Sequence, residues 1–593
     1  MTDRSRTSLP DLRFRFGSDA RAAIEGALAR ARDERWVDRL FERDSSLWSA
    51  DPAVQEAIVQ RLGWLDAPAH FTEQVGALEA FGDGIREAGF RAAVVAGMGG
   101  SSLAPEVLLR TFGAAPDWLA LRVLDSTDPE AVAATVDDLD PLTTLFIVAS
   151  KSGTTTEPLA FQADAWDRIE RAMHRRRLGG SPGAFMAAIT DPGKPLASMP
   201  HHDDLREVFL NPVDVGGRYS ALTYIGLVPA SLMGLDLDPF LTKAAMMLAR
   251  CREQEPSDNP GAALGLAMGA LAKAGRDKLT IVADPEIASF GSWAEQLIAE
   301  STGKHGVGIV PVDVEPLGAP EAYGADRVFV RLTLEGSSGP APTADGRSAD
   351  ALLDALAHGG HPVIRIALAH PMDLAGEFVR WEVAIALAGA VLGIDPFDQP
   401  NVEEAKENTR RLLADLREGG ASAIPSAPPI ASGSGIAVYG DATLRLTAGD
   451  ETLIGEFRRH LARRRPNAYL ALQSFIAPTP TRDASFARIR TRLRDRTRCA
   501  TTAGYGPRFL HSTGQLHKGG DPNGWFVQLT CDHPADRPIP GWPFSFGQLI
   551  DAQAAGDFRT IEAHDLPILR VHLGEEPDAG LAVFERTLAD ALG

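Results

Sequence analysis

Short apolar runs that alternate with amphipathic helical stretches restrict the fold of this chain more than any other feature. A first series of strand-like runs lies between residues 92 and 210, namely "AAVVAG", "LRVLDS", "TTLFIVAS", "AFMAAIT" and "REVFL". A second series lies between residues 278 and 368, namely "KLTIVAD", "GVGIVPV", "RVFVRLTL" and "PVIRIAL". Strand-like runs separated by helices are typical of βαβ units. We therefore expect two similar α/β units, each with a parallel sheet and flanking helices.

The segments outside these two series differ in composition. Residues 19–65 show helical periodicity with many charges, and "GGASAIPSAPPIASGSG" is typical of a linker. A third α/β segment follows, with "NAYLALQSF", "RFLHSTG", "GWFVQLT" and "ILRVHLG" as expected strands. The predicted division is an N-terminal helical segment at 1–65, α/β domains at 66–240 and 241–418, a linker at 419–435, and a C-terminal α/β segment at 436–593 that contributes to the site.

The charge balance argues against two classes of partner. The 593 residues include 59 Lys and Arg against 79 Asp and Glu, which gives a net charge of −20. This charge repels phosphate backbones and anionic lipid, so we expect neither nucleic-acid nor membrane binding, although a pocket can still hold a small anion. Three separated cysteines and an N-terminus without the apolar core of a signal peptide predict a cytoplasmic protein without disulfides or a zinc ribbon.

A glycine-rich loop follows the first expected strand. In "AVVAGMGGSSLAP", Gly97, Gly99 and Gly100 allow close approach of a ligand to the backbone, and the helix that follows offers free N–H groups to an anion. The loop matches neither the dinucleotide fingerprint nor the P-loop. On its own it fits a tight turn as well as a ligand loop.

Hydroxyl groups are concentrated in "SKSGTTTEP", Ser150 to Pro158, directly after a strand and before a helix. This position is the carboxyl edge of a parallel sheet, where open α/β sheets bind ligands. Hydroxyls, backbone N–H groups and the helix dipole together suit a tetrahedral dianion, and Lys151 could add a charge. The alternative is an N-cap, which needs only one of these side chains.

These two loops resemble the signature loops of the phosphoglucose isomerase family, which has the sugar-isomerase (SIS) fold. Further matches follow in order, namely "GGRYSALTYIG", "AEQLIAESTGKHGVGIVP" and "FDQPNVEEAKENT". The resemblance covers residues 90–410, and "FLHSTGQLHKGG" is similar to the isomerase half of fused transaldolase–isomerase proteins. It implies two SIS-type sandwiches plus the C-terminal α/β segment.

The resemblance also implies an activity, the interconversion of glucose 6-phosphate and fructose 6-phosphate through an enediolate. Such chemistry needs a base, a positive group beside the oxyanion, a ring-opening group and a phosphate anchor. Glu300 matches the family's base and Arg218 the arginine beside the enediolate. Without the family motifs, Glu300 would be a glutamate in the last turn of a helix, and Arg218 an arginine in a surface turn.

The remaining polar positions are carried over in the same way. The implied substrate-binding residues are Gly100, Ser101, Ser150, Lys151, Ser152, Thr155, Glu157 and Gln399. Lys406 matches a lysine that assists ring opening, whereas a lysine without that context is usually solvated.

The ring-opening histidine departs from the bacterial pattern. Related enzymes carry "His-Ser-x-Gly-Gln" soon after the glutamate motif, but "VEPLGAPEAYGADRVF" has no histidine there. The string instead occurs about 200 residues later as "HSTGQLHKGG", so we expect His511, with His517 as the alternative. Imidazole titrates near neutral pH, which suits this role.

The resemblance implies a phosphosugar substrate, no cofactor and no metal, and a homodimer that could share its active sites. The "MPHHDDL" stretch lacks metal-site geometry and is better explained as a polar loop. Two other functions stay open: a bifunctional phosphoglucose/phosphomannose isomerase, and a regulator that only binds phosphosugars. The regulator has no need for Glu300, Arg218 and Lys406 together.

Overall fold

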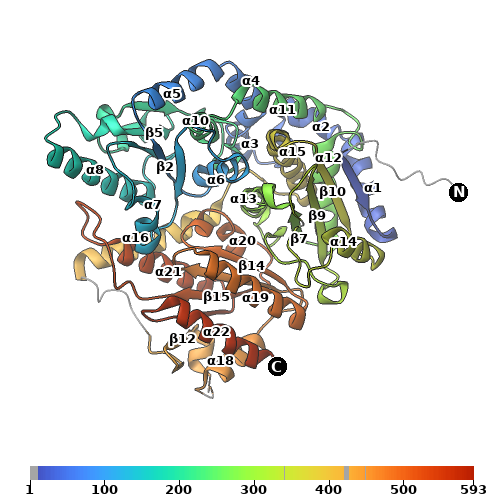
Figure 1. Ribbon diagram of the computed structural model, residues 1–593. Helices are drawn as coiled ribbons and strands as arrows, with labels where there is room; N and C mark the ends of the chain where they lie inside the picture. The colour runs from blue at the N-terminus through green and yellow to red at the C-terminus, as the bar shows by residue number, and fades with distance from the viewer. Residues whose placement is uncertain (1–10, 340, 420–426, 448, 450) are drawn as a thin grey trace.

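The computed structural model describes residues 11–339, 341–419, 427–447, 449 and 451–593, and it contains three β-sheets surrounded by helices (Figure 1). Among the described residues, no helix combines the length and the apolar character needed to cross a bilayer. The N-terminal helices are α1 (Ser18–Asp33), α2 (Trp36–Phe41), α3 (Pro52–Val59) and α4 (Ala67–Thr72).

The first sheet is parallel, with strand order β3-β2-β4-β5-β6. Its strands are β2 (Ala92–Ala96), β3 (Ala120–Leu124), β4 (Thr144–Ala149), β5 (Met186–Thr190) and β6 (Glu207–Leu210). Its helices are α5 (Val75–Glu87), α6 (Gly100–Phe112), α7 (Pro129–Val136), α8 (Thr156–Arg176), α9 (Lys194–Ser198) and α10 (Tyr224–Leu232). Strands β2 and β4 are buried throughout because helices cover both faces of the sheet, which explains their continuous apolar runs.

The second sheet has the order β1-β10-β9-β7-β8 and is parallel except for β1. Its strands are β1 (Leu12–Arg15), β7 (Lys278–Ala283), β8 (Val310–Val312), β9 (Arg327–Leu334) and β10 (Val363–Leu368). Its helices are α11 (Leu237–Arg250), α12 (Pro260–Lys273), α13 (Phe290–Thr302), α14 (Ala349–His358) and α15 (Leu374–Leu392). Strand β1 lies in the segment expected to be helical. It buries only Leu12, so its four residues carry little strand signal.

The third sheet is mixed, with the order β11-β12-β16-β15-β13-β14. Its strands are β11 (Ala431–Gly433), β12 (Ile436–Gly440), β13 (Tyr469–Phe475), β14 (Ala500–Tyr505), β15 (Gly524–Thr530) and β16 (Ile568–His572). Its helices are α16 (Pro400–Gly419), α17 (Ala442–Leu446), α18 (Leu453–Leu461), α19 (Pro480–Thr497), α20 (Gly514–Gly519), α21 (Phe546–Ala563) and α22 (Pro577–Leu592).

Two expectations for the C-terminal segment need correction. The expected strand "RFLHSTG" is wrong, because Arg508–His511 form a 3₁₀ turn and α20 begins at Gly514. The expected linker includes β11, which pairs with β12. The rest of that linker falls partly on residues 420–426, which lie outside the described residues.

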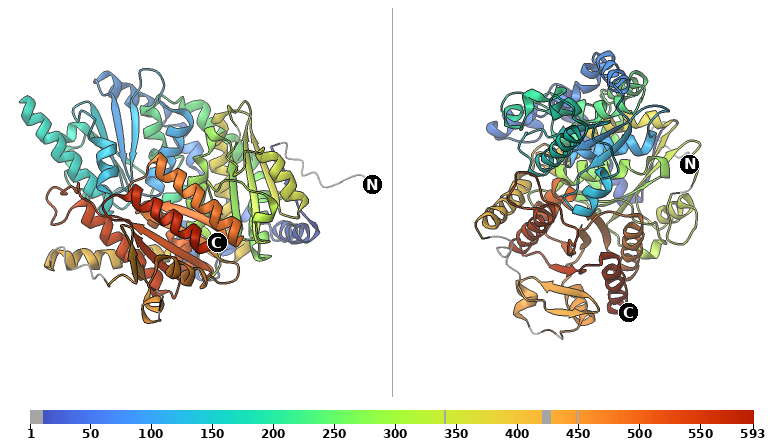
Figure 2. Two further views of the ribbon diagram at one scale, coloured as in Figure 1. Left: turned by 60° about the horizontal axis from the view of Figure 1, so that its bottom comes forward. Right: turned by 60° about the vertical axis from the view of Figure 1, so that its left-hand side comes forward.

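The three sheets pack against one another, and the C-terminal segment (orange to red) lies against both others (Figures 1 and 2). One hydrophobic core contains Val95 and Ile147 of the first sheet together with Leu279 and Val330 of the second. The opposite face of the first sheet shares a core with α8, α16 and α21. The expected α/β class with two parallel-sheet units and a third segment is therefore confirmed.

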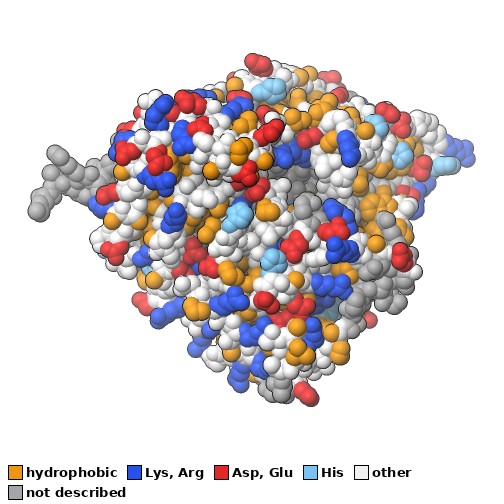
Figure 3. All heavy atoms as spheres, turned by 180° about the vertical axis from the view of Figure 1, so that it is seen from behind, with side chains coloured by type: hydrophobic (Ala, Val, Ile, Leu, Met, Phe, Trp, Pro, Cys, Tyr) orange, Lys and Arg blue, Asp and Glu red, His pale blue; other side chains and the backbone are white. Residues whose placement is uncertain are grey.

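Acidic and basic side chains are intermixed on the face in Figure 3.

Candidate active site

The hydroxyl-rich loop connects β4 to α8, at the carboxyl edge of the first sheet. The hydroxyls of Ser150 and Ser152 each lie 3.3 Å from the hydroxyl of Thr155. Thr155 is the N-cap residue of α8, yet its side chain makes no capping hydrogen bond to the helix. The N-cap alternative therefore fails to explain these side chains. The hydroxyls gather next to backbone N–H groups at a helix start, which is an arrangement suited to an anion.

The Lys151 ammonium group is engaged elsewhere. Its Nζ lies 2.8 Å from Oδ2 of Asp191 and donates a hydrogen bond to the carbonyl of Val213 at 3.2 Å. Asp191 compensates this charge, so Lys151 offers an anion less positive charge than its place in the loop suggested.

The glycine-rich loop between β2 and α6 packs tightly against two other loops. A Cβ atom at Gly99, where φ is +53°, would lie 2.6 Å from the carbonyl oxygen of His511. A Cβ atom at Gly100 would lie 2.1 Å from the carbonyl oxygen of Gly217, next to Arg218. Ser101 follows, half-buried, in the first turn of α6. These glycines allow three distant segments to meet.

Glu300 and Arg218 form an ion pair where these segments meet. Glu300 lies near the end of α13 and is buried, and its Oε1 is 3.3 Å from Nη1 of Arg218. Arg218 is only 3% exposed, so the surface-turn alternative is wrong. Its guanidinium donates to Ser301 Oγ at 2.7 Å, to Gln399 Oε1 at 3.0 Å and to the Pro396 carbonyl at 2.7 Å. The structure thus holds a charged arginine in a fixed position beside a carboxylate.

Gln296 connects Glu300 to the C-terminal segment. Its Nε2 donates to Oε2 of Glu300 at 3.0 Å and to the carbonyl oxygen of His511 at 2.7 Å. Gln296 lies one turn before Glu300 in α13, so the two side chains share a helix face. We did not single out Gln296 from the sequence, although this i, i+4 spacing was visible.

His511 faces a carboxylate of the first unit. Its Nε2 lies 3.1 Å from Oε1 of Glu157, which also accepts a hydrogen bond from Nε2 of Gln553 at 2.7 Å. Gln553 in turn accepts from the Thr127 hydroxyl at 2.6 Å. Glu157 is buried at the start of α8. The structure therefore brings His511, from the same chain, to the hydroxyl-rich loop.

His517 lies in the core of the C-terminal segment instead. Its ring is 5.2 Å from that of Phe526 and 6.0 Å from that of Tyr469, and its Nδ1 is 3.2 Å from Nε2 of Gln473. Burial lowers its pKa to about 3, so the ring stays neutral. Such a group cannot exchange protons near neutral pH.

Lys304 is a buried cation that the sequence reasoning missed. It lies four residues after Glu300 in "AESTGK", and its side chain is fully buried. Its Nζ lies 2.5 Å from Oδ1 of Asp398 and donates to the Asp398 carbonyl at 2.6 Å. Burial, and then the charge of Arg218, lower its pKa to about 8. Lys304 could have been identified from the sequence, because it lies in the same motif as Glu300.

Two predicted positions lie at or within α16: Gln399 directly before the helix and Lys406 inside it. Gln399 accepts a hydrogen bond from Arg218, as described above, and immediately precedes the first residue of the helix. Lys406 lies within α16, but its side chain is outside the described part of the structure, so its role stays a prediction.

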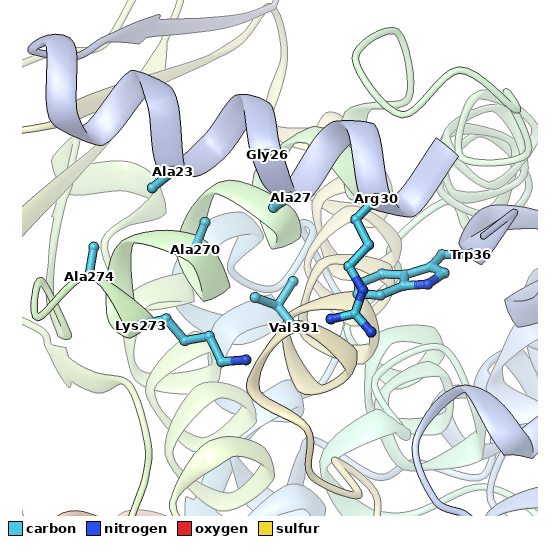
Figure 4. A pocket seen from close by; sticks show the side chains of 9 residues that line it. All are labelled: Ala23, Gly26, Ala27, Arg30, Trp36, Ala270, Lys273, Ala274 and Val391. Carbon is cyan, nitrogen blue, oxygen red and sulfur yellow. The ribbon is translucent and has the colours of Figure 1, made fainter. Parts of the chain in front are cut away.

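A cavity of about 220 Å³ lies beside the hydroxyl-rich loop. Its lining includes Ser152, Thr154, Thr155, Glu157, His511 and Gln553. A second hollow, of about 340 Å³, lies between α1, α12 and the end of α15 (Figure 4). It is lined mostly by small apolar side chains with Arg30 and Lys273, and it contains none of the predicted site residues.

Comparisons with known proteins identify the family of this chain. A family model described as phosphoglucose isomerase matches residues 19–324. A glucose-6-phosphate isomerase of Symbiobacterium thermophilum is 30% identical over 398 residues, which cover 59% of this chain and 86% of the relative. A probable glucose-6-phosphate isomerase of Natronomonas pharaonis is 33% identical over 356 residues, 54% of this chain and 79% of the relative.

A solved structure shows the same fold. The glucose-6-phosphate isomerase from Chlamydia trachomatis matches 69% of this chain and 90% of its own, with a TM-score of 0.53 and 19% identity. Since the family model covers more than half of the sequence, this chain belongs to the phosphoglucose isomerase family.

Proposed function

We propose that this protein catalyses the reversible isomerisation of glucose 6-phosphate and fructose 6-phosphate through an enediolate. Family membership and the names of its relatives support the reaction. The observation that carries the proposal is the Glu300–Arg218 pair, joined through Gln296 to the loop of His511. A protein that only binds phosphosugars needs no such pairing of a carboxylate with a fixed guanidinium.

Glu300 is the base in this proposal. Its carboxylate removes a proton from C2 of the open-chain aldose and returns it to C1, and the reverse reaction uses the same steps. Arg218 stabilises the negative charge that develops on the enediolate oxygens. Because its guanidinium is buried and held by four hydrogen bonds, it requires little reorganisation when that charge appears.

The hydroxyl-rich loop binds the phosphate group. The hydroxyls of Ser150, Ser152 and Thr155 and the N-terminus of α8 supply donors, with Gly100 and Ser101 at the neighbouring helix start. Lys151 is part of this loop, but its ammonium group is paired with Asp191 and does not contact the phosphate in this proposal.

His511 opens the sugar ring. When Nε2–H of His511 donates to the Glu157 carboxylate, the Nδ1 atom is left as a proton acceptor. Gln553 holds Glu157 from the other side and thereby fixes the imidazole orientation. Lys406 is proposed as a second group that assists ring opening.

A coupled assay tests the proposed reaction. The purified chain should convert fructose 6-phosphate to glucose 6-phosphate, detected by a dehydrogenase specific for the product. The proposed steps use no metal, so preincubation with a chelator should leave the rate unchanged. Absence of turnover in both directions would contradict the proposal.

A cytoplasmic location and a homodimer remain predictions, and size-exclusion chromatography with light scattering tests the dimer.

A further inference from the structure

Three potential metal ligands meet at a junction outside the proposed active site. Ligand atoms of Asp128, Cys531 and His533 all lie within 4.8 Å of one another. Asp128 immediately precedes α7 of the first sheet, whereas Cys531 and His533 directly follow β15 of the third. The side chain of His533 is 9% exposed, and Asp128 and Cys531 are more deeply buried.

Hydrogen bonding within the protein does not explain this grouping. Asp128 uses Oδ1 to cap α7, accepting from the N–H groups of Glu130 and Ala131, while its Oδ2 lies 3.9 Å from Nδ1 of His533. On the other side of the ring, Nε2 of His533 is buried and lies 3.6 Å from Oδ1 of Asp551, so His533 lies between two carboxylates at ion-pair distance. Both distances are too long for hydrogen bonds.

The spacing instead suits ligands of one ion. Two ligand atoms on a tetrahedral zinc ion, at bond lengths of about 2.0–2.3 Å, are separated by roughly 3.3–3.7 Å. The Asp128 to His533 separation of 3.9 Å therefore needs only a small contraction, and the pairs with Cys531, which lie within 4.8 Å, need a contraction of about 1 Å or less. A thiolate with an imidazole selects zinc-like ions over magnesium or calcium, which prefer oxygen ligands.

A nucleophilic Cys–His–Asp arrangement fits less well. Cys531 is 5% exposed and belongs to the hydrophobic core of the C-terminal segment, and buried structural cysteines are inert as nucleophiles. A nucleophile needs the thiolate. A metal ion would displace the thiol proton on binding and release it to solvent.

We propose that Asp128 Oδ2, Cys531 Sγ and His533 Nδ1 bind a divalent metal ion of the zinc class, with Asp551 orienting His533. Ligating histidines commonly donate their other ring N–H to a carboxylate, which is the place of Asp551. The side chain of Asp551 is partly exposed to solvent. The ion would join α7 to the C-terminal segment, next to the Thr127–Gln553 hydrogen bond. Its role is structural and separate from the proposed isomerase chemistry.

Cobalt(II) titration of the EDTA-treated, reduced full-length chain tests this site. Binding through Cys531 should produce a near-ultraviolet thiolate-to-cobalt charge-transfer band that saturates at one equivalent, and zinc should abolish the band. Zinc should also raise the melting temperature of the wild type, since an ion that binds only the folded state stabilises it.

Three variants make the test specific. Cys531→Ser should lose the band, whereas Cys499→Ser, which changes a cysteine outside the cluster, should keep it. Asp551→Asn changes a partly exposed side chain and should weaken cobalt binding by about 10- to 100-fold without unfolding the protein.

Two outcomes would overturn the proposal: a wild type without the band, or a band that persists in Cys531→Ser. In the first case, an NMR titration showing His533 as a stable imidazolium would identify an ion bridge between Asp128 and Asp551 instead. The isomerase assay on the metal-free chain reports separately on the proposed function.

Discussion

At the scale of single residues, His511 and His517 show how the environment separates two histidines of the same motif. His511 contacts Glu157 and lines the cavity beside the hydroxyl-rich loop. His517 lies among aromatic rings in the C-terminal core, and its pKa is lowered to about 3 by burial. The family string favoured His511, but the sequence could not show that His517 is buried, because its burial depends on contacts of α20 with residues of β13 and β15.

His511→Ala should reduce turnover of cyclic hexose phosphates by on the order of 10²- to 10⁴-fold, the usual contribution of a general acid–base group. A tetrose 4-phosphate cannot close a ring, so its isomerisation should fall much less in the same variant. Steady-state rates with both substrates measure the difference. Equal losses on the two substrates would show that His511 does not act in ring opening.

His517→Ala should lower the stability of the protein but leave its turnover nearly unchanged. Removal of a packed ring, and of its contact with Gln473, should lower the free energy of unfolding by about 2–4 kcal/mol. The folded fraction should retain near-normal turnover of both substrates. Urea unfolding together with rates per folded enzyme would show this, and a catalytic loss as large as that of His511→Ala would contradict the assignment.

At the scale of elements, helix α6 is flanked by two glycines in different surroundings. It begins where the loops of the candidate site meet, whereas no other atom lies close to the Cβ position of the glycine that follows it. Gly99 precedes the helix with φ +53°, and Gly113 follows it with φ +64°. A Cβ atom at Gly99 would lie 2.6 Å from the His511 carbonyl and 2.9 Å from Nε2 of Gln296. A Cβ atom at Gly113 would meet nothing within 4 Å.

A comparison of Gly99→Ala with Gly113→Ala should therefore distinguish two effects of an added methyl group. Both variants strain the backbone, but only Gly99→Ala crowds the candidate site. Both variants should lose about 1–2 kcal/mol of stability, because alanine is strained at positive φ. Only Gly99→Ala should also lower kcat, since the added methyl group displaces the His511 loop and Gln296. Thermal melts and steady-state kinetics on both variants test this, and an equal effect on kcat would contradict it.

Much of this element-level structure could be predicted from the sequence. The buried strands of the first two sheets have continuous apolar runs, and β2, β4, β7 and β9 lie within a residue or two of the expected positions. Strand β1 was missed because it is short, β14 because it carries polar residues, and β12 because it directly follows the expected linker. "RFLHSTG" was mistaken for a strand because the packing of α20 against α13, a long-range contact, determines its path.

The candidate site was also predicted only in part from the sequence. Family motifs identified the positions of Glu300, Arg218 and the hydroxyl-rich loop. Motifs could not reveal that Asp191 engages Lys151, or that Gln296 links Glu300 to His511, because these contacts depend on side-chain placement.

At the scale of the whole molecule, the C-terminal segment completes the site and also buries neutral histidines. His460 lies within it, 2.9 Å from the Phe526 carbonyl and stacked on Trp525. Burial lowers its pKa to about 3. The stability of this segment, and with it the position of His511, should therefore depend on pH.

The sign of this dependence follows from the protonation of His460. Its folded-state pKa, about 3, is below the ordinary value of 6.5, so the unfolded chain binds the proton first on acidification. Its contribution to stability is full above pH 6.5 and falls toward pH 3, by up to about 1.4 kcal/mol per pH unit. Glu295 and Asp313, with pKa values raised to about 8 and about 6, oppose this trend.

His460→Gln removes the titrating group and keeps an amide that can donate to Phe526. The difference in unfolding free energy between wild type and variant should shift by about 1.6 kcal/mol in favour of the variant between pH 6.5 and pH 5. Urea unfolding followed by tryptophan fluorescence at the two pH values measures it. Parallel stability curves would show that His460 does not take up a proton on unfolding.

The central claim is that the Glu300 carboxylate carries the proton between C1 and C2 of a sugar whose phosphate is held by the hydroxyl-rich loop. Glu295, on the same helix, provides a matched control. Burial, and then Asp313, raise its pKa to about 8, so Glu295→Gln replaces a largely neutral carboxyl group at pH 7.

The most direct measurement is the rate of fructose 6-phosphate isomerisation by Glu300→Gln and Glu295→Gln, together with its binding by calorimetry. We expect Glu300→Gln to lose at least about 10³-fold in kcat while its affinity for the phosphosugar changes little. Glu295→Gln should retain turnover close to that of the wild type. Wild-type kcat in Glu300→Gln, or loss of phosphosugar binding that fully explains its inactivity, would contradict the account.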